Sequence, residues 1–78
     1  NDVRLYERSA RIYASLGKRQ EQHHALAHVY ILRGNVHGAI EQLELAKEAG
    51  NDFRELSIIE KKLKEFKEIA SAKAKKPY

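Results

Sequence analysis

The chain lacks cysteine, methionine and tryptophan, and it contains only one proline among its 78 residues. Without cysteine there is neither a disulfide framework nor a thiolate metal site, and the redox compartment cannot be inferred. No apolar run approaches the roughly 18 residues that a bilayer-spanning helix needs. The first residues also lack the basic-then-apolar pattern of a secretory signal. We therefore predict no transmembrane segment in this sequence.

The positive charge of the chain is concentrated near its C-terminus. The formal net charge is +4, yet residues 1–60 hold eight Lys or Arg against nine Asp or Glu. Residues 61–76 hold seven Lys against two Glu. A basic end of this kind is usually a solvated surface, and no aromatic stacking set accompanies the lysines. We therefore predict no nucleic-acid partner, and binding of the lysines to phosphate or to an anionic membrane is the less favoured alternative.

Glycines divide the sequence into segments with apolar residues at three- and four-residue spacing. Gly17, Gly34 and Gly50 each follow such a segment, and they predict helix C-termini at which glycine adopts the left-handed conformation. The predicted helices span residues 3–16, 19–33, 36–49 and 53–71. We therefore expect a single all-α domain over residues 1–72, followed by a flexible basic tail over residues 73–78.

Local signals also indicate where the helices begin. Asn35 and Asp52 precede the third and fourth predicted helices, where their side-chain oxygens can cap the first turn. Asp52 followed three residues later by Glu55 resembles a capping box. The second predicted helix follows Lys18 and has no good cap. Gly38, near the start of the third, costs about 1 kcal/mol relative to alanine and permits a close backbone approach.

The last predicted helix has the clearest apolar stripe. Its apolar residues step by three and four along one face, and they are Leu56, Ile59, Leu63, Phe66 and Ala70. The opposite face is mostly Lys and Glu. This pattern predicts a terminal helix that closes a stacked core on one side and faces water on the other.

A short internal repeat indicates that successive helices share one template. Three residues recur after an offset of seventeen, so that Ala10, Tyr13 and Gly17 reappear as Ala27, Tyr30 and Gly34. Seventeen residues correspond to one helix and its turn, which is half of the 34-residue period of tetratricopeptide repeats. The repeat therefore predicts helix pairs stacked along one direction.

One stretch resembles a complete tetratricopeptide repeat. The matching residues are Leu26, Ala27, Tyr30, Gly34, Ala39, Ile40, Leu43 and Ala46. Small Ala27, Ala39 and Ala46 let two helices approach closely, and the larger side chains fill the space between repeats. The resemblance implies antiparallel helical hairpins in a right-handed superhelical stack, closed by a C-terminal capping helix. The alternative is a plain helical bundle whose Ala and Gly positions match by chance.

A narrower resemblance covers most of the chain. Its segments are Gly17-Lys18-Arg19, His24 to Ala27, Tyr30, Gly34-Asn35, Ala39 to Ala46, Asp52-Phe53, Ser57, Ile59-Glu60 and Leu63. These segments are similar to the C-terminal tetratricopeptide region of bacterial periplasmic zinc metallopeptidases of the β-barrel-assembly-enhancing protease family. The resemblance implies a periplasmic parent enzyme whose zinc and His-Glu-x-x-His helix lie in an upstream peptidase domain. It implies that this chain docks a substrate or the outer-membrane assembly machinery.

The histidines are the only candidates for metal or acid–base chemistry. His24 and His28 are four residues apart, so both imidazoles can lie on one helix face. The zinc-protease motif needs a glutamate directly after its first histidine, whereas Ala25 follows His24. His37 has no evident partner, and the serines lack a strained, glycine-flanked turn. We therefore predict that this chain is not an enzyme and has no metal, cofactor or catalytic site.

The helix faces that apolar residues leave free predict a groove for a peptide. In tetratricopeptide stacks the first helix of each repeat lines the concave surface. The predicted groove residues are Arg4, Glu7, Arg11, Glu21, His24, His28 and Ile31. The first function hypothesis is accordingly a protein-binding module that recruits a substrate or partner. The second is a structural cap that packs on further repeats or on the peptidase domain and binds no external ligand.

Overall fold

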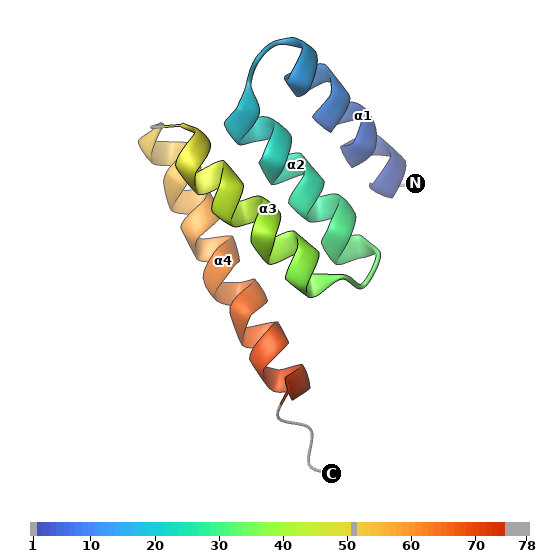
Figure 1. Cartoon of the computed structure of the whole chain (residues 1–78), viewed down its shortest axis with the longest axis vertical. Helices are drawn as coiled ribbons and strands as arrows, with labels where there is room; N and C mark the ends of the chain where they lie inside the picture. The colour runs from blue at the N-terminus through green and yellow to red at the C-terminus, as the bar shows by residue number, and fades with distance from the viewer. Residues whose placement is uncertain (1, 51, 75–78) are drawn as a thin grey trace.

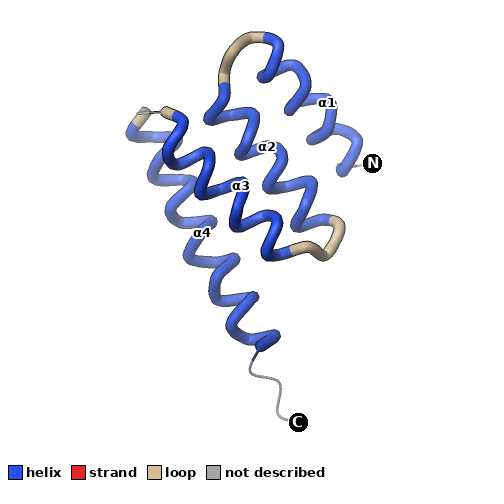
Figure 2. Tube along the Cα trace, in the orientation of Figure 1, coloured by secondary structure: helices blue, strands red, loops and turns tan. Residues whose placement is uncertain are grey.

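The computed structural model describes residues 2–50 and 52–74, and this part of the chain is helical throughout apart from short connections (Figures 1 and 2). The helices are α1 (Asp2–Ser15), α2 (Arg19–Leu32), α3 (Val36–Ala49) and α4 (Phe53–Ala74). The predicted all-α class and the antiparallel hairpins are confirmed. α4 continues three residues beyond its predicted end, so the first two residues of the predicted tail over 73–78 are helical. The rest of that tail lies outside the described residues.

The helices begin at a constant interval along the sequence. Asp2, Arg19, Val36 and Phe53 open the four helices, and each start lies seventeen residues after the one before it. α1, α2 and α3 each contain 14 residues, whereas α4 contains 22. The offset seen in three pairs of residues therefore applies to whole helices.

The helices pack in sequence order and form a flat, elongated stack. Within the described chain, extensive packing joins α1 with α2, α2 with α3 and α3 with α4 (Figure 1). The Cα atoms span 46 × 29 × 14 Å. A closed four-helix bundle would also pack its first helix along its last, and α1 and α4 do not pair in this way. The stack therefore leaves one side of α1 uncovered.

The hydrophobic core lies between α2, α3 and α4. Leu43 of α3 and Ile59 of α4 are both 0% exposed, and burying such a side chain contributes about 1.5–3 kcal/mol. Ala27, Ala39 and Ala46 are buried around them, as expected for small residues at close helix contacts. Leu63 and Phe66 complete the buried stripe of α4. Within the described residues no helix has the length and apolar character of a membrane span.

The three glycines after the helices have two different roles. Gly17 (φ 73°) and Gly34 (φ 80°) adopt the left-handed conformation that the sequence predicts. The same prediction is wrong for Gly50, whose φ of −156° and ψ of 176° are extended. A Cβ atom on Gly50 would lie 2.8 Å from Oε1 of Gln20 and 3.2 Å from its Cβ. Gln20 is only 5% exposed, so glycine is needed there for space.

The predicted caps are present at α3 and α4. Asn35 Oδ1 accepts the backbone N–H of Gly38 at 2.8 Å, and a Cβ on Gly38 would lie 2.9 Å from Tyr30 Cδ1. Asp52 Oδ1 accepts the backbone N–H two residues later at 2.9 Å. Glu55 does not complete the predicted capping box, because its carboxylate contacts α2 instead. This contact between α4 and α2 belongs to the candidate site.

Candidate functional site

A cavity of about 240 Å³ opens between three helices. Its walls combine aromatic rings, imidazoles and carboxylates, and we call it the three-helix cavity. It is lined by Tyr6, Ser9 and Tyr13 of α1, by Glu21, His24, Ala25 and His28 of α2, and by Glu55 of α4. The residues on α2 are three and four positions apart, so a single face of this helix forms the cavity floor.

A hydrogen bond between His24 and Glu55 joins the floor of the cavity to α4. His24 Nδ1 lies 2.7 Å from Glu55 Oε2, and the two side chains are 16% and 21% exposed. A carboxylate accepts hydrogen bonds, so Nδ1 is the donor and carries a proton. Glu55 can reach His24 because Asp52 caps α4 one turn earlier. The contact fixes the orientation of the His24 ring.

The other ring nitrogen of His24 has no partner. Nε2 is buried, and no hydrogen-bond partner lies within reach of it in the described structure. A serine nucleophile would need a hydrogen bond to the base nitrogen. Ser9 lines the same cavity, but no such bond to Nε2 is present. In the described structure the His24–Glu55 pair therefore holds a buried imidazole nitrogen to which no hydroxyl is hydrogen-bonded.

An aromatic wall continues from His24 across to α1. The rings of Tyr6 and His28 are stacked, with centroids 4.5 Å apart and planes 12° apart. The rings of His24 and His28 lie 5.1 Å apart at a tilt of 31°. Burial lowers the pKa of His28, and the proximity of His24 and Lys62 lowers it further. His28 is therefore neutral at pH 7.

The structure brings together three of the seven predicted groove residues. Glu21, His24 and His28 line the three-helix cavity. Ile31 packs against the hydrophobic core. The remaining three predicted residues belong to α1 and lie elsewhere.

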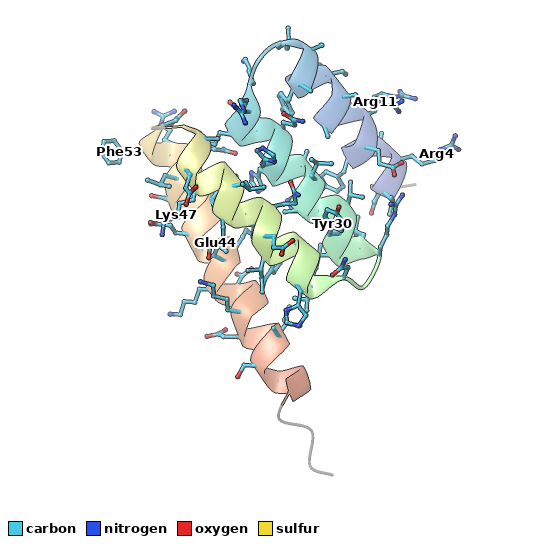
Figure 3. All side chains as sticks on the ribbon, in the orientation of Figure 1. Arg4, Arg11, Tyr30, Glu44, Lys47 and Phe53 are labelled. Atoms are coloured by element: carbon cyan, nitrogen blue, oxygen red, sulfur yellow. The ribbon has the colours of Figure 1, made fainter. Side chains whose placement is uncertain are left out.

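On α1, the side that faces the cavity differs from the predicted one. Glu7 and Arg11 line a separate cavity of about 420 Å³ between α1 and α2, and Glu7 is paired with Arg33. Arg4 points away from α2 (Figure 3). Buried Ala10 lies against α2, and this contact sets the rotation of α1. The rotation brings the tyrosine-bearing side of α1 to the three-helix cavity.

Sequence reasoning missed five residues that line the cavity. Tyr6, Ser9 and Tyr13 come from α1, Ala25 comes from α2, and Glu55 comes from α4. The spacing of Tyr6, Ser9 and Tyr13 places them on one helix face, which was a usable signal. Glu55 was assigned to a capping box, so its reach to α2 could not be seen from its local sequence.

Comparisons of the chain with protein-family models, curated proteins and solved structures found no match. Within residues 2–50 and 52–74, no group of three or more His, Cys, Asp or Glu side chains is placed to hold a metal ion. The three-helix cavity thus combines stacked rings, carboxylates and one ring nitrogen without a hydrogen-bond partner in the described structure.

Proposed function

We propose that the chain is a protein-interaction module of the tetratricopeptide type, and that the three-helix cavity belongs to its binding surface. The observation that supports this proposal best is the constant seventeen-residue interval between helix starts. Two such intervals make 34 residues, which is the tetratricopeptide period. The interval holds over all four helices, so a chance match of a few Ala and Gly residues does not explain it.

The packing supports the same function. Consecutive helices pack on one another and the first helix does not close onto the last, as in solenoids built from helix pairs. Such stacks bind polypeptides on the surface lined by the first helix of each pair. The resemblance aligns α2 with the first helix of a tetratricopeptide repeat. The same helix forms the floor of the three-helix cavity.

The resemblance to periplasmic zinc metallopeptidases extends this proposal to the parent protein. The module would follow a peptidase domain that holds the zinc, and it would recruit a substrate or an outer-membrane assembly partner in the periplasm. The chain itself would be non-catalytic and would bind no nucleic acid. Translating the coding region upstream of Asn1 tests this assignment. An export signal and a His-Glu-x-x-His helix would support it, whereas further repeats alone would refute it.

Peptide binding can be tested on the purified chain. Peptides selected from a random display library are titrated against the chain, and their affinity is measured by fluorescence anisotropy. We expect the double variant His24→Ala/His28→Ala to bind at least tenfold more weakly while its circular dichroism stays helical. His23→Ala is the matched control, because His23 belongs to the same helix but contacts Gln42 of α3 at 2.8 Å. Equal affinities for the double variant and the wild type would contradict the proposed site.

An exposed apolar stripe on α1 favours a second function, that of a structural cap. Leu5 and Ile12 lie along one side of α1 and are 60% and 51% exposed, and Leu16, which is 62% exposed, follows in the turn directly after the helix. Seventeen residues later, the positions of Ile12 and Leu16 correspond to Val29 and Arg33. Val29 is buried, and Arg33 pairs with Glu7 of α1. The stripe therefore occupies the side that receives a preceding helix in the stack.

The opposite end of the stack is polar, as a closing helix requires. On α3, Glu44 and Lys47 pair with α4 at 3.1 and 3.9 Å. Their counterparts seventeen residues later are Lys61 and Lys64 of α4, and both are exposed. In this second function the chain would close the C-terminal end of a larger helical scaffold without binding an external ligand.

Ile12→Lys distinguishes the two functions. It changes the exposed stripe without touching any residue that lines the three-helix cavity. If the chain binds peptides, the variant keeps the affinity of the wild type. If the chain is only a cap, no library peptide binds, and the substitution makes α1 of the full-length protein more sensitive to limited proteolysis.

A further inference from the structure

The lining of the three-helix cavity favours a positively charged guest. Tyr6 and Tyr13 supply aromatic rings from α1, and Glu21 and Glu55 supply carboxylates from α2 and α4. The described lining residues include no Lys or Arg. Aromatic faces and carboxylates both attract cations, and the attraction is stronger where water is partly excluded.

We infer that the three-helix cavity takes a lysine or arginine side chain of the polypeptide that the module binds. This inference rests on the proposed binding function and names the chemistry that the site selects. The volume agrees with it, because about 240 Å³ is below the range of about 300–1,000 Å³ that drug-sized ligands occupy. A single long side chain is a guest of suitable size.

The hydrogen-bonding capacity of the site also matches a basic guest. Ammonium and guanidinium groups have several N–H donors and no acceptor. Glu21 and Glu55 offer carboxylate acceptors, and His24 Nε2 is an acceptor that lacks a partner. Because Nε2 is buried, a guest reaches it only after a side-chain rotation of the kind common at interfaces. The carboxylates alone can hold the cation at the cavity mouth.

The charges around His28 make cation binding depend on pH. The titratable groups that line the cavity with His28 are Tyr6 and Tyr13 from α1, Glu21 and His24 from α2, and Glu55 from α4, and Lys62 of α4 also acts on His28. Lys62 is the one Lys or Arg in this set, and its positive charge repels a basic guest. Its Nζ lies 3.8 Å from Oε1 of Glu65, and this carboxylate partly offsets the charge. Because burial and the proximity of His24 and Lys62 lower the pKa of His28, its ring adds no charge at pH 7. Protonation of the ring in acid would repel the guest.

Short model peptides test the preference directly. The probes are blocked pentapeptides that carry lysine, arginine, norleucine or glutamate at a central position between Gly and Ser residues. Their binding to the chain is followed by NMR through the ring resonances of Tyr6 and His28. We expect saturable shifts with lysine and arginine, and little change with norleucine or glutamate. Equal affinity for norleucine and lysine would overturn the inference, because the cavity would then select apolar length alone.

Variants of the lining separate charge from shape. Glu55→Gln keeps the size of the side chain and its capacity to accept from His24, and we expect the lysine peptide to bind about fivefold more weakly. Glu44→Gln is the matched control, since this carboxylate pairs with Lys67 outside the cavity. Lys62→Met removes the competing cation and is expected to tighten binding. An unchanged affinity in Glu55→Gln together with unchanged affinity in Lys62→Met would overturn the inference.

A pH titration gives an independent readout. We expect the lysine peptide to bind at least about threefold more weakly at about pH 5.5 than at about pH 7.5, and His28→Gln to remove most of this difference. A profile that is the same in wild type and His28→Gln would count against the arrangement of charges proposed here.

The failure of this inference can be told apart from the failure of the proposed function. If library peptides bind in a His24- and His28-dependent manner but need no basic residue, the module binds peptides and the cavity takes another group. If neither library peptides nor basic probes bind, both proposals fail and the structural cap remains.

Discussion

Replacing Gly50 with alanine should destabilise the protein for a reason that is absent at the other turns. The extended backbone of Gly50 (φ −156°) accepts any residue, so alanine alone would stabilise by about 0.4–1 kcal/mol through the unfolded state. The new Cβ, however, would lie 2.8 Å from Gln20 Oε1 and 2.9 Å from Gln20 Cδ. Forcing extra volume into a packed site costs about 1–3 kcal/mol. The net loss should be about 1 kcal/mol.

The contact with Gln20 can be isolated by a double-mutant cycle. In a Gln20→Ala background the obstructing amide is gone, and the remaining 3.2 Å contact with the Cβ of residue 20 needs a shift of only a few tenths of an ångström. Gly50→Ala should then stabilise by about 0.5 kcal/mol. The expected coupling between the two sites is therefore about 1.5 kcal/mol, well above the usual deviation from additivity of about 0.5 kcal/mol. Urea unfolding of the wild type, the two single variants and the double variant, followed by circular dichroism, gives each free energy of unfolding.

Gly34 provides the control for this cycle. Its φ is +80° and a Cβ added to it would meet nothing within 4 Å, so Gly34→Ala should cost about 1–2 kcal/mol through backbone conformation alone. That cost should be the same in the wild type and in the Gln20→Ala variant. The reasoning is refuted if Gly50→Ala is at least as stable as the wild type, or if its effect does not change when Gln20 is replaced.

Three further outcomes follow from the packing, the caps and the buried ring. Leu43→Ala should lower the free energy of unfolding by about 2–5 kcal/mol, whereas exposed Leu45→Ala should change it by less than about 1 kcal/mol, both by urea titration. Asn35→Ala should cost about 1 kcal/mol by removing the cap of α3, and it should lower the thermal midpoint. The folded-state pKa of His28 lies below its ordinary value of 6.5, so its stability contribution is present above that pH and is lost as the pH falls towards the lowered pKa. Between about pH 7.5 and pH 5.5 the wild type should therefore lose more stability than His28→Gln.

The order and limits of the helices could be predicted because their signals are local. A glycine that needs a positive φ, such as Gly34, marks a helix end, and Asn35 supplies a cap from its own side chain. The apolar stripe of α4 follows from helical periodicity alone. Gly50 shows where this reasoning stops. Position 50 needs glycine because the side chain of Gln20 leaves no room for a Cβ atom. Gln20 is distant in the sequence, so no local pattern reveals this contact.

The candidate site could be predicted only in part, for the same physical reason. His24 and His28 share a helix face whatever surrounds them, so their spacing placed both at one surface. The partner of His24 is Glu55 on α4, and that contact depends on how α4 packs across the stack. On α1 the sequence suggested the side with Arg11, but buried Ala10 turns the tyrosine side towards the cavity.

Most of the packing in the described chain joins consecutive helices, and this arrangement has a consequence for how the chain opens and closes. Contacts between consecutive helices join residues close in sequence, and such topologies fold quickly because little chain entropy is lost before contacts form. In the described chain α1 packs extensively only on α2, and Ala10 is its one buried residue. Detaching α1 therefore breaks little buried packing and costs little free energy. We expect the amide hydrogens of α1 to exchange with solvent before those of α3. A guest held between Tyr6 and Glu55 would contact both α1 and α4. Because it would bind only while α1 is docked, binding would also stabilise the docked state of α1.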